Sequence, residues 1–199
     1  GMERCHSHFT KKEFEDYLEE GKQSLVEFVN YFTEDWMKPS SFETEFIIST
    51  ECRGVPLSGK LDRVENHNDS LRVVDFKTGS SSKHEREKPP SESLPYGGNY
   101  WQQMVFYAVL LKHCGHFPKL PVRSALYFIK SKDGIFTKKE IDTSSHVDFL
   151  EDLIERCYRD IAAAKFAPGC GKDECSWCRY VSTGATSSLL PEEEDEEFN

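Results

Sequence analysis

A hydrophobic segment that ends in an acid and a base constrains this chain more than any other feature. Residues 71–77 read Leu-Arg-Val-Val-Asp-Phe-Lys, and their β-branched and aromatic side chains predict a buried β-strand. Because side chains alternate across a strand, Asp75 and Lys77 point to one face and Phe76 to the other. The pair is either a surface ion pair, worth about 0–1 kcal/mol, or part of a site that needs a carboxylate and an ammonium together.

The remaining periodicity predicts an α/β fold around this strand. Helical spacing of apolar residues occurs in three segments: 10–36, with Gly21 as a possible interruption and Thr10 and Glu13 as a capping box; 99–112; and 145–165, with Ser145 as a cap. Strand-like segments lie at 42–50, 54–65, 71–76, 122–130 and 135–141. This order predicts a central mixed β-sheet flanked by helices, whose first three strands form an antiparallel meander.

The length of 199 residues suits one well-packed domain. We predict an N-terminal helical segment at 1–41, a core domain at 42–180 and an acidic, disordered tail at 181–199. The net charge is −10, which argues against a nucleic-acid partner. However, six consecutive acids at 192–197 supply more than half of that charge, so the rest of the chain is only mildly acidic.

The sequence favours a cytoplasmic protein. No apolar run approaches the roughly 20 residues of a membrane span, and no secretory signal opens the chain. Seven cysteines are an odd number for a disulfide framework, and this favours a reducing, intracellular setting in which clustered cysteines are candidate metal ligands. Cys52 and Cys114 stand alone and are interpreted as isolated thiols.

Two carboxylates converge if the predicted meander forms. Asp62 lies near the end of the second strand and Asp75 near the end of the third, so the two side chains come close together. Neighbouring carboxylates repel each other unless a cation holds them, and Mg²⁺ prefers one or two carboxylates together with waters and substrate phosphate. Lys77 beside such a metal can orient an attacking water or neutralise charge on a phosphate.

Three motifs in this order resemble the PD-(D/E)XK nuclease superfamily, and in particular the RecB/AddB-type exonuclease domain. The motifs are Gly59-x-x-Asp62-Arg63, Asp75-x-Lys77-Thr78-Gly79 and Gln103-x-x-x-Tyr107. The triplet Asp-x-Lys alone is weak, but the ordered set over roughly residues 42–180 is much more specific. The resemblance implies a restriction-endonuclease-like core.

The resemblance also implies roles for individual residues. Asp62, Asp75 and the backbone carbonyl of Phe76 would bind Mg²⁺ or Mn²⁺, and Lys77 would be the catalytic lysine. Gln103 and Tyr107, one helical turn apart, would hold the lysine region or the DNA strand. The implied reaction is hydrolysis of DNA phosphodiesters, on single strands or duplex ends, as the C-terminal nuclease region of a UvrD/Rep-type superfamily 1 helicase used in recombination or repair.

One departure from the family keeps a second function open. The family usually has a metal-binding histidine on a helix upstream of the first strand, whereas His6 and His8 precede the predicted first helix and that helix contains no histidine. Either this ligand lies outside the chain or this member has lost it. The alternative to an active nuclease is therefore a weakly active or inactive module that binds DNA or braces a helicase.

A cysteine cluster near the C-terminus is a second candidate site. Cys175 and Cys178 have metal-ligand spacing, and Cys170 adds a third thiol. Related AddB-type nucleases carry an iron–sulfur cluster in a similar segment, but the last cysteine expected there is missing, so Cys157 or Cys5 would have to supply the fourth ligand. The segment is an iron–sulfur site, a zinc site, or three reduced thiols on a turn.

The polar connection at 78–97 contains a small basic patch beside the predicted active site. Lys83, His84, Arg86 and Lys88 form the patch, which either contacts phosphates or is a solvated linker. Tyr100 and Trp101 follow at the start of a predicted helix. They either stack on bases of a single strand or belong to the core.

Overall fold

A computed structural model describes residues 9–79, 84–165, 174–176 and 178–179. The chain forms two compact units, Gly1–Glu155 and Arg156–Asn199. The first unit contains the sheet and nearly all of the helices, and the fold below is that of this unit.

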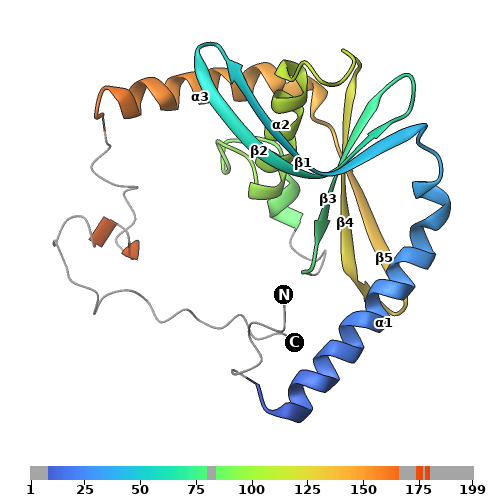
Figure 1. Ribbon diagram of the computed structural model, residues 1–199. Helices are drawn as coiled ribbons and strands as arrows, with labels where there is room; N and C mark the ends of the chain where they lie inside the picture. Colours follow the sequence, from blue (N-terminus) through green and yellow to red (C-terminus); the bar gives the residue numbers. More distant parts are fainter. Residues whose placement is uncertain (1–8, 80–83, 166–173, 177, 180–199) are drawn as a thin grey trace. The chain divides into compact units, whose positions relative to one another are not determined.

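A five-stranded mixed sheet forms the centre of the first unit (Figure 1). Its strands follow one another in chain order: β1 (Ser41–Cys52), β2 (Val55–Asn66), β3 (Leu71–Lys77), β4 (Val122–Lys132) and β5 (Ile135–Ile141). β1, β2 and β3 form an antiparallel meander, β3 and β4 are parallel, and β4 and β5 are antiparallel. The predicted α/β fold with a mixed sheet is therefore confirmed.

Helix α1 (Lys11–Trp36) packs its second half against one face of the sheet. Phe28 and Phe32 are buried there and meet Tyr127 of β4 and Phe136 of β5. The predicted capping box is present, because the Thr10 hydroxyl accepts from Glu13 N and the Glu13 carboxylate accepts from Thr10 N. The predicted interruption at Gly21 is wrong: the helix runs through it, with open space around the glycine.

Helix α2 (Asn99–His113) covers the opposite face and supplies most of the main core. Trp101, Met104, Val105, Ala108 and Leu111, the stripe expected from helical spacing, are all buried. Gly59 of β2 lets the helix approach closely, because a Cβ at that position would lie 2.6 Å from Leu110 Cδ1. The first glycine of the motifs described above therefore has a packing role.

Helix α3 (Val147–Ala162) begins later than its predicted cap. A 3₁₀ turn, η3 (Ser144–His146), precedes it, and the Asp142 carboxylate accepts hydrogen bonds from the backbone and side chain of Ser144 and from the side chain of Ser145. The short polar residues at this boundary therefore form a turn around Asp142, and the prediction of Ser145 as the helix cap is wrong. Leu150, Leu153 and Ile154 of α3 pack against the core beside α2.

The connection from β3 to α2 has more structure than the sequence predicted. Its second half contains a 3₁₀ turn, η2 (His84–Glu87), and an isolated bridge between Ser91 and Leu94. Gly98 donates its N–H to Lys88 O at 2.8 Å, and a Cβ on Gly98 would lie 2.2 Å from Glu85 O. Glycine at this position lets η2 pack directly on the start of α2. Among the described helices, none combines the length and the apolar character needed to cross a membrane.

Candidate active site

The antiparallel pairing of β2 and β3 brings the two predicted carboxylates together. Arg63 pairs with Val74, so the next position on each strand places Asp62 beside Asp75. The Asp62 carboxylate accepts a hydrogen bond of 2.9 Å from the backbone N–H of Phe76. Asp62 is therefore fixed against the last residues of β3, one position from the lysine.

Asp75 is almost completely buried, with 3% of its surface exposed. Burial raises the pKa of its carboxyl group, and the nearby Asp62 charge raises it further, against the opposing effect of Lys77. Lys77 Nζ lies 2.7 Å from Asp75 Oδ2 and forms an ion pair with it. A buried carboxylate oxygen with unused acceptor capacity beside a second carboxylate is a fitting ligand for a divalent cation.

Gln103 of α2 connects three of the predicted site residues. Its Oε1 accepts a hydrogen bond of 2.6 Å from Lys77 Nζ. Its Nε2 donates to Asp75 Oδ1 at 2.9 Å and to the Tyr107 hydroxyl at 2.8 Å. One amide side chain therefore orients the acid and the base with respect to each other, and burial raises the pKa of the Tyr107 hydroxyl behind it.

Tyr100 adds a contact that was not assigned from the sequence. Lys77 Nζ lies 4.6 Å from the centre of the Tyr100 ring, a cation–π distance. The Tyr100 hydroxyl accepts a hydrogen bond of 3.1 Å from Arg86 Nη1 of η2. A basic residue of the polar connection is thereby held next to Lys77, whereas Trp101 is buried in the core. Lys83, also part of the predicted basic patch, lies outside the described residues.

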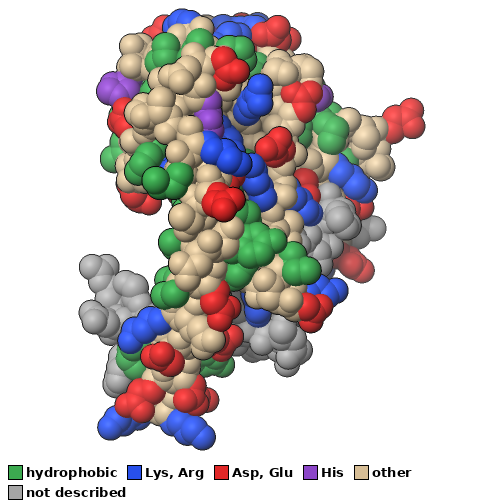
Figure 2. Space-filling model, turned by 90° about the vertical axis from the view of Figure 1, so that its right-hand side faces the viewer, with side chains coloured by type: hydrophobic (Ala, Val, Ile, Leu, Met, Phe, Trp, Pro, Cys, Tyr) green, Lys and Arg blue, Asp and Glu red, His purple; other side chains and the backbone are tan. Residues whose placement is uncertain are grey.

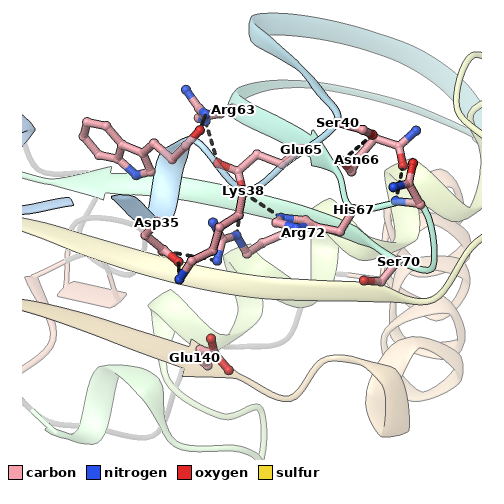
Figure 3. A network of polar contacts seen from close by, with 12 residues as sticks. Asp35, Lys38, Ser40, Arg63, Glu65, Asn66, His67, Ser70, Arg72 and Glu140 are labelled. Carbon is pink, nitrogen blue, oxygen red and sulfur yellow. Dashed lines mark hydrogen bonds and ion pairs between the residues drawn. The ribbon is translucent and has the colours of Figure 1, made fainter. Parts of the chain in front are cut away.

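Arg63, the neighbour of Asp62 in the first motif, points to the other face of the sheet. There it joins a buried ionic network with Glu65 and Arg72 (Figure 3). Glu65 is fully buried, and its two oxygens lie 2.7 Å from Arg63 Nε and 2.5 Å from Arg72 Nε. In this motif, Asp62 lies at the candidate site, whereas the next residue, Arg63, lies on the other face of the sheet and pairs with Glu65.

Asp35, near the end of α1, extends this network to the helix layer. Its Oδ2 lies 3.3 Å from Arg72 Nη1 and 3.1 Å from Lys138 Nζ, and it accepts a short hydrogen bond from the Tyr127 hydroxyl. Burial by itself would raise the pKa of Asp35, but Tyr127, Lys138 and Arg72 outweigh it and hold the pKa far below its usual range. These charges fasten α1 to β3, β4 and β5. Sequence reasoning missed them, since isolated charged residues carry no pattern.

The face of the molecule shown in Figure 2 carries charges of both signs. Lys and Arg side chains lie interspersed with Asp and Glu side chains there. The acidic side chains on this face therefore do not form a separate acidic surface.

The predicted C-terminal cysteine site remains a prediction. Cys170 lies outside the described residues, while Cys175 and Cys178 are partly buried in the second unit. His6, His8 and Cys5 also lie outside the described residues. Within the described part of the chain, three metal-ligating groups do converge at a place that the sequence did not indicate: Cys52, His113 and Glu151.

A known structure shares this fold. A crystal structure of a proposed exonuclease from Eubacterium rectale matches with a TM-score of 0.51 and 16% sequence identity, covering 79% of this chain and 59% of that chain. This chain thus spans less than two thirds of the length of that protein. The crystal structure of SSO0001 matches with a TM-score of 0.40 and 17% identity, covering 95% of this chain and 81% of that chain.

The family model of the PD-(D/E)XK nuclease superfamily matches residues 3–183, which include all of the site residues described above. No curated protein matches at a significant level. The mixed sheet flanked by helices agrees with the restriction-endonuclease-like fold of this superfamily. This chain belongs to the PD-(D/E)XK nuclease superfamily.

Proposed function

We propose that this chain is a deoxyribonuclease that needs Mg²⁺ or Mn²⁺ and hydrolyses DNA phosphodiesters from the end of a single strand. The observation that carries the proposal is the convergence of four side chains at the carboxyl end of β3, the central strand: Asp62, Asp75, Lys77 and Gln103. Asp75 Oδ2 lies 2.7 Å from the Lys77 ammonium, and a carboxylate oxygen has a second lone pair that a cation can use.

The residues present fit a divalent cation. Asp62 and Asp75 would hold it through their carboxylates, and the Phe76 carbonyl would be a third oxygen ligand. When bound, such a cation lowers the pKa of a coordinated water and offsets negative charge on the phosphate. It would also relieve the repulsion between Asp62 and Asp75, which helps to raise the pKa of Asp75 in the metal-free protein.

The protein groups would orient the reactants and balance the charge. Hydrolysis joins a water oxygen to phosphorus, breaks one phosphorus–oxygen bond of the backbone, and leaves the departing oxygen to take up a proton. The Lys77 ammonium, held by Gln103 and by the Tyr100 ring, would stabilise the charge that grows on the phosphate oxygens. Gln103 would hold Lys77 and Asp75 in a fixed relative position during this step, since it makes a hydrogen bond to each of them.

The single-stranded substrate and the helicase partner extend the proposal beyond the family assignment. Arg86 and Tyr100 beside Lys77 supply a guanidinium and an aromatic ring, the groups that bind phosphates and bases of single strands. The resemblance to RecB/AddB-type exonuclease domains supports a role in recombination or repair together with a superfamily 1 helicase motor.

The test is cleavage of single-stranded DNA labelled at either end, with Mg²⁺, with Mn²⁺ and with chelator. We expect metal-dependent release of short products, reduced at least about 100-fold in Lys77→Ala. An exposed lysine, Lys22 on α1, provides the control variant Lys22→Ala, which should retain full activity.

Two outcomes would overturn the proposal. Cleavage that persists in Lys77→Ala would place the chemistry elsewhere. DNA binding without cleavage, needing no metal and surviving Asp75→Ala, would instead identify a DNA-binding module. The helicase partnership is tested separately, by asking whether a superfamily 1 helicase with ATP converts blunt duplex DNA into a substrate. If it does not, the nuclease assignment stands without that partner.

A further inference from the structure

Three side chains of different chemical types meet at the ends of β1 and α2 and the start of α3. Cys52 is the last residue of β1, His113 is the last residue of α2, and Glu151 lies in the first turns of α3. Their ligand atoms all lie within 4.8 Å of one another, and His113 Nε2 is 2.9 Å from Glu151 Oε1. A thiol, an imidazole and a carboxylate at these distances form the donor set that Zn²⁺ prefers.

The distances suit a tetrahedral ion after small adjustments. Zinc bonds of about 2.0–2.3 Å place neighbouring ligand atoms roughly 3.3–3.6 Å apart. His113 and Glu151 would have to separate by a few tenths of an ångström, and Cys52 would have to approach them by up to about 1.2 Å. Side-chain rotation can supply such movements without displacing the backbone.

Charged side chains surround these three residues. Two cations contact the Glu151 carboxylate: Lys112 Nζ lies 2.7 Å from its Oε1, and Arg53 Nη2 lies 3.3 Å from its Oε2. Lys112 also contacts Asp148. Arg53 also contacts Asp152 and Glu155. These contacts hold the Glu151 carboxylate beside Cys52 and His113.

Burial distinguishes a metal site from a nucleophilic one. Cysteine, histidine and glutamate also form hydrolytic triads, but such a cysteine must be reached by a substrate. Cys52 is 0% exposed, so no substrate can reach its sulfur. A bound metal ionises a coordinating thiol, so it can use a buried cysteine that a substrate cannot.

We propose that Cys52, His113 and Glu151 bind one Zn²⁺ ion with a water as the fourth ligand, and that this ion fastens α2 and α3 to the end of β1. The neighbouring hydrogen bond of 2.9 Å from Thr50 Oγ1 to His113 O already joins β1 to the end of α2. The ten residues from Gln103 to His113 span about 15 Å of helix, so the zinc site is separate from the catalytic carboxylates. Its role would be structural, and it does not depend on nuclease activity.

The experiment measures metal content and spectra in a chain that carries Cys170→Ser, Cys175→Ser and Cys178→Ser, so that the C-terminal cysteines cannot contribute. We expect one zinc per chain after dialysis, and a thiolate-to-cobalt charge-transfer band when Co²⁺ replaces zinc. Both signals should be lost in Cys52→Ser and in Glu151→Gln. Cys114→Ser, which removes the other buried thiol near the end of α2, is the matched control and should keep both.

Thermal unfolding provides a second readout. Zinc at roughly 100 times its Kd should raise the Tm of the background chain by about 5–10 °C, and it should leave the Tm of Cys52→Ser unchanged. Absence of a cobalt band in the background chain would overturn the proposal, as would zinc retained at full occupancy in Cys52→Ser. Circular dichroism of each variant ensures that a lost signal does not come from unfolding.

Discussion

Lys77 Nζ and Gln103 Oε1 are in direct contact, with a hydrogen bond of 2.6 Å between the last residue of β3 and the first turns of α2. The two elements belong to adjacent layers of the fold, and this bond fixes the ammonium with respect to the carboxylate of Asp75. The position of the Lys77 ammonium therefore depends on how α2 packs on the sheet.

The first prediction concerns Gln103. Gln103→Glu keeps an acceptor for Lys77 but removes the N–H groups that donate to Asp75 and Tyr107. It also places a negative charge beside a buried carboxylate. We expect kcat for DNA cleavage to fall by about 10–100-fold with a smaller change in KM, because positioning rather than binding is lost. Gln23→Glu on the exposed side of α1 makes the same change in net charge and should leave both constants unaltered.

The second prediction separates activity from stability at Asp75. Asp75→Asn should abolish metal-dependent cleavage, yet its free energy of unfolding at pH 7 should equal or exceed that of the original chain. The reason is that burial and Asp62 disfavour the charged form of Asp75, whose pKa is raised in the folded state.

The raised pKa also gives the sign of the pH dependence. A carboxyl whose folded pKa is raised costs stability above that pKa and costs none once pH falls below its unfolded value of about 3.9. The stability advantage of Asp75→Asn should therefore shrink toward acid pH. Urea titrations between pH 4 and pH 8 check this, and a variant markedly less stable at pH 7 would contradict the assignment. Asp133→Asn, at the turn between β4 and β5 where φ is 53°, is the control.

The third prediction concerns acid unfolding through Asp35. Its pKa is depressed in the folded state, so it contributes stability above the unfolded pKa of about 3.9 and loses that contribution as pH falls toward its folded pKa. Asp35→Asn should lower the free energy of unfolding by about 1–3 kcal/mol at pH 7. The difference should narrow below pH 4. A penalty that stays constant down to acid pH would show that packing, not charge, is responsible.

The fourth prediction tests the buried ionic network. Glu65→Ala leaves the guanidinium groups of Arg63 and Arg72 buried without their shared carboxylate. We expect a loss of about 3–5 kcal/mol in the free energy of unfolding. A chain in which Glu65, Arg63 and Arg72 are all replaced by apolar residues of similar size should lose much less, since no uncompensated charge remains. Equal losses in the two variants would refute this explanation.

The fifth prediction compares two glycines that differ in their surroundings. Gly98→Ala places a Cβ 2.2 Å from Glu85 O and should push η2 away from α2, weakening the contact between Arg86 and Tyr100. We expect a loss of stability and a higher KM for DNA. Gly21→Ala meets nothing within 4 Å inside α1, and it should stabilise the chain by about 0.5–1 kcal/mol. Chemical denaturation and cleavage assays on both variants provide the comparison.

Local patterns predicted much of the fold and the arrangement of the active site. Alternation along residues 71–77 placed Asp75 and Lys77 on one face, and the structure has Phe76 packed on the other side against Phe28 and Trp36. One-turn spacing placed Gln103 and Tyr107 together, and they share a hydrogen bond. Such inferences succeed because they depend only on the period of one element.

Contacts between distant elements could not be predicted in this way. Glu65 reads as an ordinary strand residue until the sheet pairs it with Arg72, and Asp35 reads as an exposed helix residue until α1 docks on β4. Cys52, His113 and Glu151 lie on three different elements, so no spacing rule connects them. At Gly21 a local signal was overestimated instead. The helix runs through this residue, because the intrinsic cost of one glycine in a helix is small compared with the packing that holds α1 on the sheet.

The parallel pairing of β3 with β4 requires one long crossover, and that crossover contains η2 and α2. β3 and the helix that contacts Lys77 are thus joined by a single stretch of chain. Added length in a surface loop costs little free energy, about 0.6 kcal/mol for each doubling. Added residues in this connection would therefore cost the fold little, provided that η2 keeps its packing on the start of α2.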